Sequence, residues 1–406
     1  MRLKEKRVEL IVQKYGGSSL KRPEDVRRVA GQVAQLYQSG KRLIVVVSAM
    51  GSATDELLHL AYKVSKKPNR RELDMLLTAG ERVSMALMSM ALHNLGCPSI
   101  SFTGSQAGVL TDPSHSNAHI LDLKPIRVNG ALEQGKVVVL AGFQGVDPIS
   151  KEITTLGRGG SDTTAVAMAA HFKAQRCEIL KDVDGIFSAD PKVIPHTHHY
   201  KVFPFSAIEE ACFWGSKVLH FRSVELARSL KVPLYVGSSF RPDKGTTIQE
   251  EVSKMYEQTA PLTVNSMDEV HQLSVNCSNP AEGLQTMDKE LRLHQLAWPQ
   301  ILATAFEQGF LRMMVSASHE QMQALLQALE SSPIKTIAEP LASVTLTCKG
   351  LYSSTLPEQI LSRLQQDSIA PQKTISGACS FSLFVRPEEK ERTIRVLHHF
   401  IEQQLP

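Results

Sequence analysis

The sequence predicts an α/β fold with a mostly parallel central sheet, followed by smaller α+β parts. Through the first half of the chain, short aliphatic runs alternate with longer stretches of helical periodicity. This alternation is typical of a parallel sheet with helices on both faces. After about residue 255, strand-like runs are interspersed with helical stretches in a different pattern, which indicates a second architecture.

The elements can be placed from these patterns. The predicted strands of the first half are Val8–Val12, Leu43–Ser48, Pro98–Phe102, Lys136–Phe143, Cys177–Leu180 and Val232–Ser238, and the helices include Pro23–Tyr37, Leu73–Asn94 and Thr163–Lys173. The polar stretch Lys244–Met255 indicates a domain boundary. Beyond it we expect strands at His271–Cys277, Phe310–Ala317, Ser343–Gly350 and Cys379–Pro387, and helices at Glu320–Leu329 and Pro357–Gln365. This remainder fits two α+β units of about 70 residues each.

Composition narrows the class of protein. A chain of 406 residues is too long for one ordinary domain, and 42% hydrophobic with 21% charged residues is typical of a globular protein. The net charge of +4, without a basic block, does not indicate nucleic-acid binding. No apolar run reaches the roughly 18 residues of a membrane span, and the N-terminus lacks the pattern of a signal peptide. We therefore expect a cytoplasmic protein.

Cysteine and histidine usage predicts neither disulfides nor a metal site. The six cysteines are scattered and form no CxxC pair, which favours reduced thiols in a cytoplasm. His196, His198 and His199 lie in a polar loop between prolines, without the cysteine or carboxylate spacing of a zinc site. We expect no protein-held metal.

The segment from Leu156 to Ala170 is the most informative of the chain. Arg158, Gly159, Gly160, Ser161 and Asp162 stand directly before an alanine-rich helical run. The glycines allow close approach of a ligand, and the amides at the helix start can bind an anion. Arg158 can grip a carboxylate or phosphate with two N–H groups, and Asp162 can position a cation or a metal. The alternative is a glycine turn that only caps the helix, with Asp162 as a first-turn charge.

A second glycine turn follows the first predicted strand. Lys14 and Tyr15 precede Gly16, Gly17 and Ser18, and a strand that ends in this way can offer backbone amides to phosphate oxygens. Lys14 adds a positive charge. The spacing is that of neither a Walker A loop nor a GxGxxG fingerprint.

Four further blocks accompany these turns: Val45–Leu57, Leu76–Leu87, Ser101–Asp112 and Leu180–Pro195. Together with the two turns, they resemble aspartokinase of the amino-acid-kinase family over about residues 8–240. The resemblance implies a three-layer αβα catalytic domain at residues 1–250. It also implies two ferredoxin-like ACT domains, at 260–335 and 336–406. The first is divergent, because Ser278, Asn279, Pro280 and Ala281 stand where the family has a D-x-P-G turn.

The activity implied by the resemblance is transfer of the ATP γ-phosphoryl group to the β-carboxylate of L-aspartate, with Mg²⁺, at the start of lysine, threonine and methionine synthesis. A carboxylate acceptor is ionised at neutral pH and needs no general base. The family pattern assigns Lys14 and Asp162 to catalysis. It assigns substrate binding to Ser48, Thr54, Glu81, Arg158, Gly159, Gly160 and Ser161. Glu81 would accept the ammonium group of aspartate, and Arg158 would bind its α-carboxylate.

The resemblance also implies a nucleotide site, with departures. Its residues are Lys14, Tyr15, Gly16, Gly17, Ser18, Lys181, Asp182, Gly185, Phe187, Ala189, Asp190, Pro191, Lys192 and Lys217. Lys181 occupies a position that is usually serine or threonine, Phe187 replaces a tyrosine, and Lys192 replaces an arginine. Phe187 keeps a stacking face, and Lys192 keeps the charge but not the forked geometry.

Regulation and alternatives complete the expectations. ACT pairs associate between chains, so a homodimer or homotetramer is expected. The divergent first ACT turn predicts weak or absent inhibition by lysine or threonine. Two alternatives remain open: a kinase of the same fold with another acceptor, such as acetylglutamate, carbamate or a nucleoside monophosphate, and a non-catalytic regulatory protein. Retention of Lys14, Glu81, Arg158 and Asp162 argues against the second.

Overall fold

The structure, a computed structural model, describes residues 9–250, 260–294, 296–330, 336–350 and 355–403. These residues form two compact units. The N-terminal unit comprises residues 9–186, 199–212 and 217–250, and the C-terminal unit comprises 187–198, 213–216 and the described residues from 260 onward. The start of the first predicted strand, Val8, and the predicted boundaries at 251–259 and 331–335 lie outside the described residues.

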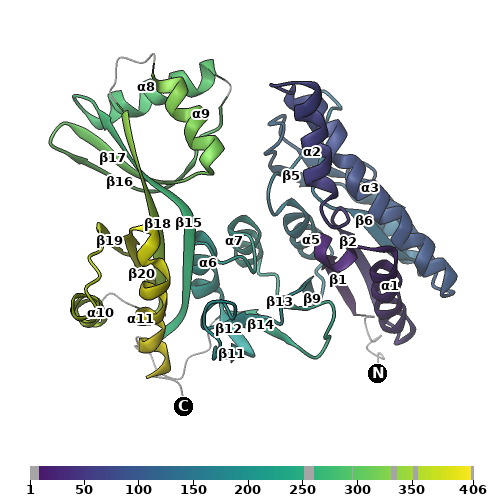
Figure 1. Cartoon of the computed structure of the whole chain (residues 1–406). Helices are drawn as coiled ribbons and strands as arrows, with labels where there is room; N and C mark the ends of the chain where they lie inside the picture. The colour runs from purple at the N-terminus through teal and green to yellow at the C-terminus, as the bar shows by residue number, and fades with distance from the viewer. Residues whose placement is uncertain (1–8, 251–259, 295, 331–335, 351–354, 404–406) are drawn as a thin grey trace, which may run out of the picture. The chain divides into compact units, whose positions relative to one another are not determined.

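A mostly parallel sheet of eight strands forms the centre of the N-terminal unit (Figure 1). Its strands, in the order β12-β14-β13-β9-β1-β2-β6-β3, are Val202–Pro204, Gly245–Gln249, Leu234–Ser238, Arg176–Lys181, Leu10–Tyr15, Arg42–Val47, Val137–Ala141 and Ser99–Phe102. Every neighbouring pair is parallel except β13 and β14. The predicted α/β class with a largely parallel sheet is therefore confirmed.

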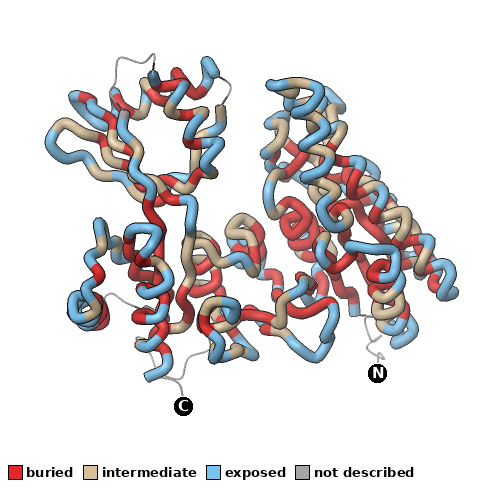
Figure 2. Tube along the Cα trace, in the orientation of Figure 1, coloured by how far each residue is buried: buried red, intermediate tan, exposed pale blue. Residues whose placement is uncertain are grey.

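Helices cover both faces of this sheet. On one face α1 (Pro23–Gln38) and α3 (Arg70–Asn94) pack against side chains of β1, β2 and β6. The opposite face carries α5 (Gly160–His171), which also packs on α7 (Phe221–Ser229). The central strands are buried along nearly their whole length, as the red segments of Figure 2 show. Strands covered on both sides lose the polar–apolar alternation of an exposed sheet, which is why they were readable as continuous aliphatic runs.

Shorter elements complete the unit. The helical ones are the 3₁₀ turn η1 (Gly17–Leu20), α2 (Ala53–Val64), α4 (Ile126–Glu133) and α6 (Phe205–Phe213). A separate four-stranded sheet has the order β5-β4-β7-β8, and its strands are Ile120–Leu123, Val109–Thr111, Gln144–Val146 and Ile153–Thr155. A two-stranded ladder joins β10 (Ile186–Phe187) to β11 (His199–Tyr200). The four-stranded sheet was not predicted, because strands of three or four residues are too short for alternation to be recognised.

Among the described helices, α3 alone is long and apolar enough to meet a length-and-composition test for a membrane span. That test is weak support, because a core helix of a globular protein also passes it. α3 packs against α1, α2, β3 and β6, and nine of its residues, spread from Asp74 to Leu92, are buried. The most apolar 18-residue window of α3 is 44% buried by packing inside the unit.

The C-terminal unit is α+β, with one antiparallel sheet of six strands. In the order β16-β17-β15-β18-β20-β19 these strands are Gln300–Glu307, Phe310–Ser316, Ala260–Asn276, Thr336–Lys349, Ser380–Val385 and Lys373–Ser376. Its helices are α8 (Pro280–Leu293), α9 (His319–Leu329), α10 (Leu356–Gln366) and α11 (Lys390–Glu402), with the 3₁₀ turn η2 at Pro387–Glu389. The divergent turn keeps a structural role: Asn279 caps α8 by accepting a bond from the amide of Glu282 (3.0 Å), and Pro280 occupies the first helical turn.

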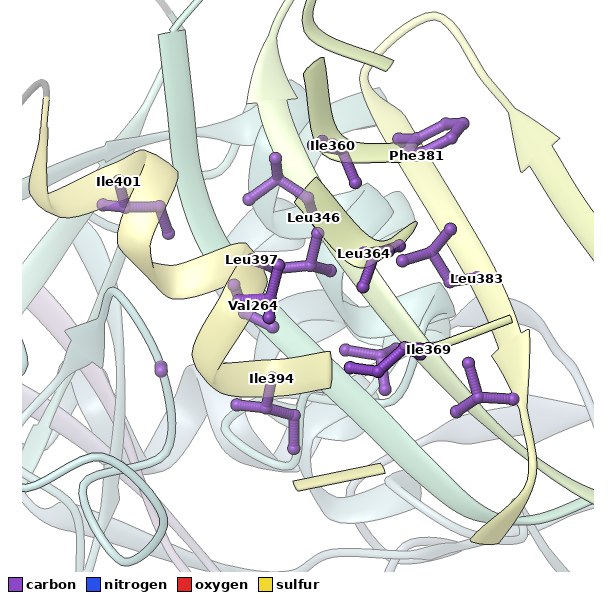
Figure 3. Packing of buried hydrophobic residues seen from close by; sticks show 14 of the residues in the cluster. Val264, Leu346, Ile360, Leu364, Ile369, Phe381, Leu383, Ile394, Leu397 and Ile401 are labelled. Atoms are coloured by element: carbon purple, nitrogen blue, oxygen red, sulfur yellow. The ribbon is translucent and has the colours of Figure 1, made fainter. Parts of the chain in front are cut away.

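The two larger hydrophobic cores of this unit lie along the shared sheet. One joins Leu273 and Val275 of β15 to β17, α8 and α9. The other joins β18, β20, α10 and α11 around residues such as Leu346, Leu397 and Phe381 (Figure 3). Val264, from the first part of β15, belongs to this second core. β15 is therefore a single 17-residue strand that serves both cores.

The C-terminal unit also contains a segment from the first half of the chain, residues 187–198. Ala189 and Ile194 are buried in the core of α10 and α11. Ser188 is fully buried, and its Oγ lies 2.9 Å from Nε2 of His398 on α11. The amide of Val264 donates to the Ser188 carbonyl at 2.8 Å. The conformation of this segment is thus fixed from the C-terminal unit.

Residues 213–216 belong to the same unit. Trp214 is 3% exposed and packs edge-to-face on Phe384, with ring centroids 6.1 Å apart. Val270, Met314 and Leu341 complete this small core. Trp214, to which the sequence assigned no role, is a core residue.

Candidate active site

A buried ion pair lies at the carboxyl end of the central sheet. Lys14 is the next-to-last residue of strand β1, and Asp162 lies in the first turn of α5. Lys14 Nζ is 2.7 Å from Asp162 Oδ1, and the two side chains are only 7% and 3% exposed. Parallel strands have their carboxyl ends at the same edge of a sheet. The sheet therefore brings Lys14, at the end of a strand, close to Asp162, at the start of a helix, although they are 148 residues apart in the sequence.

Lys181 is a second cation on the same carboxylate. Its Nζ lies 3.3 Å from Asp162 Oδ2, and it comes from β9, the neighbour of β1. Burial alone would raise the pKa of Asp162, but Lys14 and Lys181 outweigh it and lower the pKa to about 2. Burial lowers the pKa of Lys14, and the charge of Lys181 lowers it further, while Asp162 opposes both. The lysine that replaces the usual hydroxyl residue thus joins this charge cluster.

The Gly16–Gly17 turn lies beside this cluster. A Cβ at Gly16 would be 3.6 Å from Lys14 Nζ, and one at Gly17 would be 2.7 Å from the carbonyl oxygen of Ala49. A side chain at Gly17 would therefore collide with the loop after β2. The Gly16 amide already donates to the Leu180 carbonyl (3.3 Å), so it is not one of the amides available to a phosphate. Tyr15 is 1% exposed and packs in the core, so only its main chain could face a ligand.

Glu81 is a buried carboxylate on α3. Its Oε1 accepts a bond from the amide of Ala49 (3.1 Å), whereas Oε2 has no hydrogen-bond partner in the part of the chain that the structure describes. Burial raises the pKa of Glu81 to about 7, although the Ala49 amide and Lys14 act in the opposite direction. A carboxylate that is 3% exposed with one unpaired oxygen is suited to accept a hydrogen bond from a cationic ligand group.

Arg158 lies on the exposed loop between β8 and α5. Among the described residues, none forms an ion pair or a hydrogen bond with its guanidinium, which leaves this group available to a ligand. Gly159 has a φ of +72° and precedes the first residue of α5, Gly160, while Ser161 is 7% exposed. Ser48 follows β2 and Thr54 lies in the first turn of α2, both partly exposed.

His220 lies at this site, although the sequence analysis did not predict it as a site residue. A Cβ at Gly159 would lie 2.4 Å from His220 Cγ and 2.9 Å from its Nδ1, so the imidazole packs directly on the glycine turn. Nδ1 is buried and has no hydrogen-bond partner among the described residues. Burial lowers the pKa of His220 below its ordinary value, with Asp162 opposing and Arg158 among the groups that add to the lowering. The sequence analysis identified only Lys217, three residues earlier, in this part of the chain.

The residues predicted for the nucleotide fall in both units. Lys14, Gly16, Gly17, Ser18, Lys181, Asp182, Gly185 and Lys217 belong to the N-terminal unit, and Phe187, Ala189, Asp190, Pro191 and Lys192 belong to the C-terminal unit. Gly185 has a φ of +125°, and a Cβ there would lie 2.5 Å from Thr246 Oγ1. In the C-terminal unit, Ala189 is buried and Lys192 is exposed. The Asp190 carboxylate caps its own turn by accepting a hydrogen bond from the Lys192 amide (2.9 Å).

Comparisons with known proteins show the family to which the chain belongs. A model of the amino acid kinase family matches residues 9–238. The aspartokinase of Bacillus sp. (strain MGA3) is 35% identical over 403 residues, covering 97% of each chain. The chain belongs to the aspartokinases of the amino acid kinase family. The aspartokinase of Mycolicibacterium smegmatis is 51% identical over 254 residues, but this match spans 63% of the present chain and only 60% of that relative's length.

Solved structures support the fold. Escherichia coli aspartokinase III in complex with aspartate and ADP has a TM-score of 0.80, over 97% of this chain and 100% of that one. The same enzyme in complex with lysine and aspartate has a TM-score of 0.73, over 97% and 99%. Both are 21% identical to this chain, so the likeness concerns the fold alone.

The contact between Gly159 and His220 predicts a difference between two glycine substitutions. Gly159→Ala and Gly135→Ala both place a Cβ at a φ near +70°, which costs about 1–2 kcal/mol of backbone strain. Only at Gly159 does the new Cβ collide with a neighbour, since nothing lies within 4 Å at Gly135. Thermal unfolding should therefore show Gly159→Ala to be the less stable variant by at least about 1 kcal/mol. Equal loss of stability would contradict the packing of His220 on this turn.

Proposed function

We propose that this protein is an aspartate kinase, which transfers the γ-phosphoryl group of ATP to the β-carboxylate of L-aspartate and forms 4-phospho-L-aspartate. The observation that carries the proposal is the arrangement of charge at the sheet edge. A buried lysine–aspartate pair with a second, partly buried lysine lies in the unit that also carries a buried carboxylate with an unpaired oxygen and an exposed arginine. Its aspartokinase relatives, one of them matched over 97% of its length, support the same activity.

Two residues of opposite charge would recognise the amino acid. Glu81 Oε2 would accept a hydrogen bond from the ammonium group, and the Arg158 guanidinium would bind the α-carboxylate with two N–H groups. Ser48, Thr54 and Ser161 offer hydroxyl groups for the β-carboxylate and the transferred phosphoryl group. The start of α5, at Gly159 and Gly160, would receive the same group, although the Gly160 amide itself donates to the Gly157 carbonyl (3.0 Å). Solved relatives that contain aspartate support an amino acid ligand.

Catalysis would depend on alignment and neutralisation of charge. The acceptor carboxylate is ionised already, so no residue has to remove a proton from it. Lys14 would stabilise the charge that develops between the β- and γ-phosphates, and Lys181 would contribute a second positive charge nearby. Asp162 would hold both ammonium groups in place, since it is ionised throughout the neutral range.

Within the N-terminal unit, ATP would be bound by the Gly16–Gly17 turn together with Lys181, Asp182, Gly185 and Lys217. The solved relative with ADP supports use of an adenine nucleotide. For Mg²⁺, no cluster of three or more histidine, cysteine, aspartate or glutamate side chains exists in the described residues. Asp162 fits a contact through water, and the phosphates of ATP would supply most of the oxygen ligands. When bound, Mg²⁺ would neutralise phosphate charge.

The remaining proposals concern organisation. We place the catalytic domain at 1–250 and the two ACT-like domains at 260–335 and 336–406, with residues 187–198 and 213–216 packed among the latter. A cytoplasmic homodimer or homotetramer that associates through the ACT-like part would fit the family. The product would enter synthesis of lysine, threonine or methionine.

A direct assay tests the proposed activity. Purified protein with Mg-ATP and L-aspartate should form an acyl phosphate, trapped as the hydroxamate with hydroxylamine. Asp162→Ala should reduce kcat by at least about 100-fold, because the two lysines lose the group that positions them. Product formation from acetylglutamate, carbamate or a nucleoside monophosphate instead of aspartate would contradict the acceptor. Unchanged turnover in Asp162→Ala would contradict the assigned site.

The raised pKa of Glu81 predicts a pH dependence of substrate capture. The ammonium group of aspartate needs ionised Glu81, which is fully present only above its pKa of about 7. kcat/KM for aspartate should therefore rise about tenfold per pH unit below pH 7 and level off above it. Glu81→Gln should have a lower and flat profile. A wild-type profile without a rise between pH 6 and 8 would exclude this role.

Feedback inhibition should be weak. The turn that stands in place of D-x-P-G serves as a helix cap in this chain, through Asn279 and Pro280. We expect more than half of the activity to remain at micromolar lysine or threonine, measured in the hydroxamate assay. Loss of more than half at those concentrations would refute the expectation.

A further inference from the structure

A second buried carboxylate, Asp74, lies on α3 in the N-terminal unit. Its side chain is 0% exposed, and no lysine or arginine pairs with it among the described residues. It is satisfied by groups from two other segments. Thr155 donates from Oγ1 (2.6 Å) and from its amide (3.1 Å), the amide of Ser116 donates at 3.1 Å, and His115 Nδ1 lies 2.8 Å away. A carboxylate so fully desolvated needs every one of these partners, so it fixes the segments that supply them.

Those segments support the loop that carries Arg158. Thr155 ends β8, and the chain continues through Leu156 and Gly157 to Arg158. The carbonyl of Thr155 accepts from the amide of Ala118 at 2.9 Å. Gly157 has a φ of +74°, and a Cβ there would lie 3.1 Å from the carbonyl oxygen of Ser116. The Arg158 loop therefore rests directly on residues 116–118, which Asp74 holds.

Arg222 of α7 joins the same two segments from another helix. It donates to the carbonyl of Leu156 at 2.8 Å and to the carbonyl of Ala118 at 2.6 Å. Burial lowers the pKa of Arg222, and Asp112 opposes that shift. With both carbonyls bound to one guanidinium, neither segment can move without the other.

Asp74 and Glu81 are seven residues apart on α3, two turns of one face, or about 10.5 Å along the helix axis. One rigid helix thus carries the proposed ammonium anchor and supports the proposed carboxylate anchor. We propose that Asp74 and Arg222 are positioning residues that set the place of Arg158 relative to Glu81, and so make the enzyme select amino acids with a free α-carboxylate. This inference rests on the role proposed for Arg158.

The test compares L-aspartate with its α-amide, which retains the β-carboxylate and the ammonium group but offers Arg158 no α-carboxylate. The full chain is assayed with hydroxylamine trapping. If the α-amide turns over too slowly to measure, its inhibition constant against L-aspartate is measured instead of its kcat/KM. In Asp74→Asn the new amide N–H₂ would face the backbone amides of Ser116 and Thr155, which are also donors. We expect kcat/KM for aspartate to fall at least tenfold, the value for the α-amide to stay within about twofold, and KM for ATP to be unchanged.

Arg222→Gln is the second variant, and it should reduce the preference for aspartate in the same way. Asp147→Asn is the matched control. Asp147 is 5% exposed in the turn between β7 and β8 of the same small sheet, and among the described residues its carboxylate accepts hydrogen bonds from nearby Ile149 and Ser150 alone. This variant should keep the wild-type preference.

The outcomes separate this inference from the proposed function. An equal fall for both substrates in Asp74→Asn and Arg222→Gln would overturn the inference, because it would mean general disruption. If Arg158→Ala loses the preference for L-aspartate over its α-amide while Asp74→Asn and Arg222→Gln keep it, the inference is also overturned, and the proposed function stays intact. If Arg158→Ala itself keeps the wild-type preference, the role of Arg158 in the proposed function fails as well.

Discussion

The contact between Asp162 and two lysines is the interaction on which the rest of the N-terminal unit depends. Taking a carboxylate and an ammonium group out of water costs several kcal/mol each, and it is tolerable only when the partners are held in good geometry. Lys14 and Lys181 come from adjacent parallel strands, and Asp162 comes from the first turn of the helix above them. The register of β1 on β9 and the start of α5 must all be correct for the three charges to meet. The central sheet therefore holds Lys14, Lys181 and Asp162 in the positions that allow their charges to pair.

Close backbone packing completes that frame. Gly17 lies against the carbonyl of Ala49, whose amide in turn binds Glu81. Gly80 lies so near to Ala49 that a Cβ would be 2.7 Å from the alanine Cβ. The loop after β2 is thus held between the first glycine turn and α3. The positions of Glu81 and of the Lys14 turn are coupled through the main chain of one short loop.

Much of the fold and part of the site could be predicted from the sequence. Continuous aliphatic runs marked the parallel strands because both faces of that sheet are buried, and Lys14, Glu81, Arg158 and Asp162 lie in local motifs. The missed features depend on distant partners. Asp74 binds residues 41 to 81 positions away, and Arg222 binds carbonyls 66 and 104 positions away. Such hydrogen bonds leave no periodicity in the chain, and His220 is recognisable only once its ring lies on Gly159.

The placement of residues 187–198 bears on how such proteins can be divided or recombined. A chain shortened after residue 250 would keep this segment but lose the core that buries Ala189 and Ile194, and it would leave Ser188 without His398. An exchange of C-terminal halves between relatives at the polar stretch near residue 250 would meet the same difficulty. The pairs Ser188–His398 and Trp214–Phe384 would have to be inherited together, although each straddles the point of exchange. The C-terminal unit therefore does not correspond to one continuous stretch of the sequence that could be exchanged as a block.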